Sequence, residues 1–86
     1  MKELPTINKI ETGKNIKRLM KNAKMGTFEL QKYLELTSPS SIYLWLRGEY
    51  VPNAESLVKL AYLFNCTVDE ILIKEESDDE QTITTM

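Results

Sequence analysis

Apolar residues recur at three- and four-residue intervals along most of the chain, the spacing of amphipathic helices, and turn-forming residues separate the stretches. The pattern predicts five helices. The apolar positions expected to face the core in the first, second and fourth of them are Ile16, Leu19, Met20 and Ala23; Leu30, Tyr33 and Leu34; and Leu57, Leu60, Ala61 and Phe64. Short turns between such helices favour a compact all-α bundle.

Polar and glycine residues mark where these helices should begin. Thr12 is the expected N-cap of the first helix, Gly26 of the second and Asn53 of the fourth. Thr67 and Glu70 form a capping box ahead of a short fifth helix. We therefore expect an N-terminal arm at residues 1–11, a helical domain at 12–74 and an acidic, disordered tail at 75–86.

The third helix combines a buried stripe with a polar beginning. Ser38 is expected to cap it, Pro39 to occupy its first position, and Gly48 to end it. With Ile42 and Trp45 in the core, the side chains left to solvent are Ser40, Ser41, Tyr43 and Leu44. Two short helices joined by a turn, the second polar at its amino end, are typical of a helix-turn-helix, whose second helix fits the major groove of B-DNA.

The charge distribution is compatible with DNA binding, although the net charge is −2. Residues 1–74 carry all eleven basic residues against eight acidic ones, whereas residues 75–86 carry five acidic residues and no basic one. Seven of the basic residues lie in the first 24 positions, so one end of the folded domain should be electropositive. The acidic tail then has two interpretations: a solubilising end, or a competitor that covers the basic face.

The chain lacks most residue types that build catalytic and metal sites. It has no histidine, no glycine-rich phosphate loop and a single cysteine, Cys66, which we interpret as a small buried apolar residue. We expect no enzyme activity, no cofactor, no metal and no small-molecule ligand. One cysteine, no apolar N-terminal run and no stretch of membrane length favour a cytoplasmic location without membrane insertion.

Residues 12–73 resemble the Cro/repressor helix-turn-helix family, also called the XRE type, in the order and spacing of their motifs. The matching motifs are Thr12-Gly13, Ile16-x-x-Leu19, Leu30-x-x-x-Leu34, Ile42-x-x-Trp45-x-Arg47-Gly48, Pro52, Leu57-x-x-Leu60-Ala61-x-x-Phe64 and Thr67-x-Asp69-Glu70-Ile71-Leu72. The resemblance implies a lambda-repressor-like bundle of five helices that binds double-stranded DNA as a homodimer on a two-fold operator.

The resemblance also implies which residues touch DNA. The groove-facing positions of the third helix are Pro39, Ser40, Ser41, Tyr43 and Leu44. Phosphate contacts would come from Lys14 and Asn15 at the start of the first helix, Thr27 at the start of the second, and Arg47 and Tyr50 around the loop after the third. Helix N-termini suit phosphate because their free N–H groups and dipole favour an anion.

The sequence departs from the family pattern at four places. The stretch before the third helix is one residue longer than usual, and Glu35 and Gln31 stand where a turn glycine and a small alanine are common. Gly26 replaces the usual threonine cap. Met20 and Leu46 occupy positions at which many members have a buried arginine and glutamate, so we expect these two side chains to touch.

Together these features favour a sequence-specific transcriptional regulator, a repressor, that inserts its third helix into the major groove. Serine and leucine are modest base readers, and the positive charge is small. The alternative is therefore a helix-turn-helix protein-interaction module, such as an antitoxin or the partner of a regulator, that does not read DNA.

Overall fold

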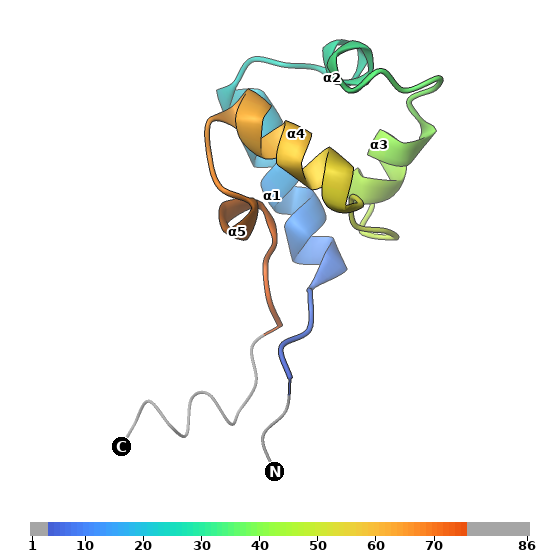
Figure 1. Ribbon diagram of the computed structural model, residues 1–86. Helices are drawn as coiled ribbons and strands as arrows, with labels where there is room; N and C mark the ends of the chain where they lie inside the picture. The colour runs from blue at the N-terminus through green and yellow to red at the C-terminus, as the bar shows by residue number, and fades with distance from the viewer. Residues whose placement is uncertain (1–3, 76–86) are drawn as a thin grey trace.

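The computed structural model describes residues 4–75, which form five α-helices (Figure 1). They are α1 (Lys9–Asn22), α2 (Thr27–Leu34), α3 (Ser40–Leu46), α4 (Ala54–Phe64) and α5 (Val68–Ile71). In Figure 1, α4 crosses in front of α1, with α2 above, α3 to the right and α5 to the lower left. The predicted all-α, five-helix fold is confirmed; the predicted tail beyond residue 75 lies outside the described residues.

All five helices contribute to one hydrophobic core. Its buried side chains are Ile16 and Met20 of α1, Leu30 and Leu34 of α2, Ile42 and Trp45 of α3, Leu60 of α4 and Ile71 of α5. Leu57, Ala61 and Phe64 pack against this cluster as the periodicity of α4 predicts. The same inference was wrong for Tyr33, which is 58% exposed, because the eight-residue α2 turns only Leu30 and Leu34 inward.

The first helix begins earlier than its sequence suggested. Asn8 is the N-cap, and its Oδ1 accepts a hydrogen bond from the backbone N–H of Glu11 at 3.0 Å. Residues 9–11, expected in the arm, are therefore the first turn of α1. Thr12, the predicted cap, is buried inside the helix instead, where its Oγ1 accepts from the N–H of Ile73 at 2.9 Å.

The two ends of the described chain are joined beside the first turn of α1. The N–H of Asn8 donates to the carbonyl of Ile73 at 2.7 Å, and that of Glu75 donates to Thr6 at 2.6 Å. Ile7 and Lys74 form an isolated antiparallel bridge between these bonds. The chain therefore enters and leaves the helical body at the same place, at the bottom of Figure 1.

The predicted caps of α2, α4 and α5 are observed, whereas Ser38 is not the cap of α3, whose N-cap is Pro39. Asn53 accepts from the N–H of Ser56 at 2.8 Å at the start of α4, and Thr67 forms the predicted capping box with Glu70 at α5. The C-caps of α2 and α4, Glu35 (φ 58°) and Asn65 (φ 56°), are left-handed residues other than glycine, and so is Lys24 (φ 58°), which follows the cap of α1. A residue with a side chain is held in that conformation at a cost of about 1–2 kcal/mol, so the packing around these turns must supply it.

Glycine is required where α1 approaches the end of α3. A Cβ on Gly13 would overlap the carbonyl oxygen of Trp45 and lie 3.1 Å from that of Leu46. One turn earlier, the backbone of Ile10 comes within 2.8 Å of where a Cβ on Gly48 would be, and Gly48 has a φ of +79°. These two glycines let α1 lie directly on the C-terminal turn of α3.

No helix within residues 4–75 has the length and apolar character needed to cross a bilayer.

We predict that Gly13→Ala destabilises the protein by about 1–3 kcal/mol, the usual cost of overpacking. An alanine inside a helix normally stabilises it by about 0.5–1 kcal/mol relative to glycine, so the expected sign is opposite to that of helix propensity. Urea unfolding followed by circular dichroism measures the change. Lys17→Ala, at an exposed position of the same helix, is the control and should shift stability by no more than about 0.5 kcal/mol. A stabilised Gly13→Ala protein would contradict the close approach.

The contact between Met20 and Leu46 remains a prediction, although both side chains belong to the one core. We expect Met20→Arg alone to cost about 3–5 kcal/mol, as an uncompensated buried charge does. Adding Leu46→Glu should recover part of that loss, and a double-mutant cycle by urea unfolding should give a favourable coupling of at least about 1 kcal/mol. If the two changes are additive within about 0.5 kcal/mol, the side chains do not meet.

Candidate nucleic-acid interface

The side of α3 opposite its buried stripe is open to solvent. Ile42 and Trp45 are 0% and 5% exposed and fix the helix to the core. On the opposite side, helical periodicity brings Ser40, Tyr43 and Arg47 into one row, and all three are exposed, Tyr43 by 47%. An anchored helix with a free polar face is the geometry that a major-groove reader needs.

The other predicted groove-facing positions lie at the margins of this row. Ser41 is exposed, whereas Pro39 and Leu44 are half-buried. The predictions for the start of α3 were wrong: the helix begins at Ser40 with Pro39 as its N-cap, and Ser38, whose Oγ accepts from the N–H of Ser40 at 3.3 Å, lies one residue before the cap. The residues assigned to base reading thus lie around the amino end and the middle of α3, and Pro39 and Leu44 are the less accessible ones.

The turn before α3 accommodates its extra residue without a glycine. Glu35 takes the left-handed conformation, and its N–H donates to the carbonyl of Lys32 at 3.1 Å. The side chain of Gln31 donates from Nε2 to the carbonyl of Leu36 at 3.3 Å. The long side chain at position 31, where a small residue is usual, therefore supports the lengthened turn.

The loop after α3 holds a cation whose charge is already paired. Arg47 Nε donates to Glu49 Oε2 at 2.7 Å, and both side chains are more than half exposed. An exposed pair of this kind is worth at most about 1 kcal/mol, so it can open when a phosphate offers a competing anion. Tyr50, the next predicted phosphate contact, follows Glu49 in the sequence, and its side chain is 60% exposed.

The amino end of α2 offers a further contact point. Gly26 caps the helix, and its N–H donates to Glu29 Oε1 at 2.8 Å. Thr27, the predicted phosphate contact, is the first residue of α2 and is half-buried. Phe28 follows it and is 75% exposed, a feature that the sequence did not single out because Phe28 lies outside the apolar stripe. Its exposed ring next to a helix N-terminus enlarges the surface available to a partner.

Lys14 and Asn15 are not at the start of α1, which corrects the helix-terminus argument made for them. Because α1 begins at Lys9, both lie in its second turn and their N–H groups are within the helix. Lys14 Nζ pairs with Glu11 Oε2 at 3.3 Å and is otherwise exposed. Asn15 has a structural role: its Nδ2 donates to the carbonyls of Glu70 and Ile71 at 2.7 and 3.0 Å, which ties α1 to α5.

Cys66 lies half-buried just ahead of α5, in a shallow depression lined by Tyr62, Asn65 and Glu70 among others. Burial raises the pKa of the Cys66 thiol, the carboxylate of Glu70 raises it further, and Arg18 partly opposes them. A reactive cysteine needs a lowered pKa, so the shift has the wrong direction for a nucleophile and agrees with a packing role.

We predict that iodoacetamide alkylates Cys66 more slowly in the folded protein than in urea between pH 7 and 10. A raised pKa leaves less thiolate at each pH, so the midpoint of the rate profile should move to higher pH in the folded state. Since Cys66 is the sole cysteine, mass spectrometry reports this site alone. A folded midpoint below the unfolded one would contradict the assignment.

The comparisons with known proteins agree with this geometry. The family model of the Cro/C1-type HTH DNA-binding domain matches residues 15–77, well over half of the chain, and covers α2, α3, the intervening turn and the Arg47–Tyr50 loop. No curated protein and no solved structure matches the chain. With its anchored α3 and the family match, the chain belongs to the Cro/C1-type helix-turn-helix DNA-binding domains, and its general function is that of a DNA-binding regulator.

Proposed function

We propose that the protein is a sequence-specific transcriptional regulator, acting as a repressor, that inserts α3 into the major groove. The observation that carries the proposal is the division of α3 into a buried side, Ile42 and Trp45, and an exposed row, Ser40, Tyr43 and Arg47. The core fixes the orientation of the helix, so the free side can enter a groove without rearrangement of the fold. Members of this family typically act without catalysis, and we ascribe no enzymatic step to the chain.

Affinity in this proposal comes mainly from phosphate. Thr27 at the amino end of α2, together with Arg47 and Tyr50 after α3, would contact the backbone on either side of the groove. Lys14 can contribute through its exposed ammonium, whereas the side chain of Asn15 is engaged with α5. Arg47 and Lys14 both exchange a carboxylate partner for a phosphate, so the net gain from each is small and strongly salt-dependent.

Sequence specificity would come from a less polar recognition surface than most DNA-binding proteins use. Ser40 and Ser41 can bond to several base edges, and Leu44 can contact a thymine methyl group. None of them provides the bidentate recognition of arginine or glutamine, so DNA shape and deformability should account for much of the preference. We propose that the body at residues 12–74, with the first turn of α1, binds in the cytoplasm as a homodimer on a two-fold operator.

Selection of bound sequences from a random DNA pool, followed by anisotropy titration, tests the proposal. Arg47→Gln should weaken binding to all sequences and reduce the salt slope by about one, whereas Ser40→Ala with Ser41→Ala should lower the preference for the selected site about tenfold. Lys59→Gln on α4 is the control and should change neither quantity by more than about twofold.

Two outcomes would contradict parts of the proposal. A selected site without two half-sites one helical turn apart would remove the two-fold dimer. Absence of binding to any duplex at about 50 mM salt, where phosphate contacts are strongest, would contradict DNA recognition and favour the alternative, a protein-interaction module.

A further inference from the structure

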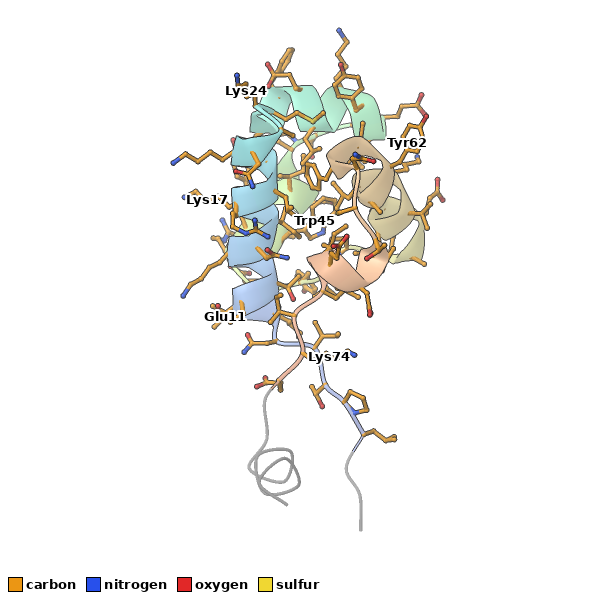
Figure 2. The ribbon with its side chains drawn as sticks, turned by 90° about the vertical axis from the view of Figure 1, so that its left-hand side faces the viewer. Glu11, Lys17, Lys24, Trp45, Tyr62 and Lys74 are labelled. Atoms are coloured by element: carbon orange, nitrogen blue, oxygen red, sulfur yellow. The ribbon has the colours of Figure 1, made fainter. Side chains whose placement is uncertain are left out.

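The outer side of α1 carries a row of exposed cations, here called the basic face: Lys14, Lys17, Arg18 and Lys21. They lie opposite Ile16 on the helix, and Figure 2 shows Lys17 pointing away from the core at Trp45. Within residues 4–75, Lys14 is the member of the face with a carboxylate at salt-bridge distance. Arg18 bonds instead to the neutral Oδ1 of Asn15, at 2.7 Å from Nη2. The face therefore has more positive charge than its surroundings balance.

The described chain ends beside the first turns of α1, the helix that carries this face. Glu75 is held to Thr6 by a 2.6 Å hydrogen bond, and Ile73 is held to Thr12 inside the first turns of α1. In Figure 2, Lys74 lies below and to the right of Glu11, where the chain leaves the helical body, whereas Lys17 points to the left. Any chain beyond residue 75 thus starts beside the helix that carries the basic face, a placement that the sequence alone did not reveal.

The residues that follow have the complementary charge. Four of the five residues at positions 76–80 are acidic, namely Glu76, Asp78, Asp79 and Glu80. Residues 76–86 contain no basic residue. A helix rises about 1.5 Å per residue, so the distance from the first turn of α1 to Lys21 is about 20 Å. An extended chain covers about 3.3–3.6 Å per residue, so the five residues 76–80 span about 17–18 Å, enough to pass Lys14, Lys17 and Arg18 and to approach Lys21.

We propose that the acidic segment 76–80 binds the basic face of α1 and competes there with the phosphates of DNA. The second half of this statement rests on the proposed DNA-binding function. The individual ion pairs would be weak and screened by salt, but the segment is tethered beside its target, which raises its effective concentration to the millimolar range. Non-specific DNA, held by charge alone, is then displaced more readily than a specific site that also engages α3.

A neutral-tail variant of the full chain, with Glu76→Gln, Asp78→Asn, Asp79→Asn and Glu80→Gln, tests the proposal. Its affinity for a duplex of scrambled sequence should rise about five- to tenfold at about 50 mM salt and by less than about twofold at about 300 mM. Equal affinity of the two proteins at low salt would overturn competition and leave the tail as a solubilising end.

A second comparison distinguishes direct contact from general charge repulsion. In a Lys17→Gln, Lys21→Gln background, neutralising the tail should raise the affinity clearly less than in the native background, because two of the four cations of the basic face are gone. In the control background Lys32→Gln, Lys59→Gln, on α2 and α4, the full gain should persist. The same gain in both backgrounds would mean that the tail acts through long-range charge alone, which overturns binding to the basic face.

Amide chemical shifts keep this inference separate from the proposed function. Comparing the native and neutral-tail proteins at low salt without DNA, we expect shifts concentrated at residues 14–21. Their presence supports the contact even if no duplex binds, and their absence overturns it even if DNA binding is confirmed.

Discussion

The arrangement depends on how closely α1 can lie on the end of α3. Because residue 13 has no side chain, the carbonyls of Trp45 and Leu46 pack directly on the backbone of α1. That contact positions the C-terminal turn of α3 and the Arg47–Tyr50 loop, while Ile42 and Trp45 hold the rest of the helix in the core. Because Ile42, Trp45 and the contact with α1 hold one side of α3 in the core, the exposed row on its other side faces solvent.

Much of this could be predicted from the order of apolar residues and caps. The stripes of α1, α3 and α4 and the caps at Asn53 and Thr67 follow from local rules, since spacing and capping chemistry act within a few residues. Asn8 carried a readable signal as well, because Glu11 stands three residues after it, but the apolar stripe that begins at Ile16 favoured Thr12, the wrong start. Tyr33 was misplaced because periodicity over eight residues defines a face too loosely.

The candidate interface was less predictable, because side-chain partners come from distant parts of the chain. Thr12 and Asn15 look like helix-start residues in the sequence, yet each bonds to a segment more than fifty residues away, at Ile73 and at Glu70 and Ile71. The pairing of Arg47 with Glu49 is local but depends on the turn that Gly48 makes. A family pattern indicates which positions contact DNA in its members. It does not show which of those side chains are already engaged in hydrogen bonds within this fold.

The left-handed Glu35 has a mechanical consequence. Glu35, in the connection between α2 and α3, holds a backbone conformation that costs about 1–2 kcal/mol, and α2 has two buried residues, both leucines, one turn apart. Small changes in the angle between α2 and α3 are therefore inexpensive compared with changes between α1 and α3, where backbone meets backbone. The contact between α1 and α3 is therefore the stiffer of the two, and α2 can tilt at a lower cost in free energy than α3 can.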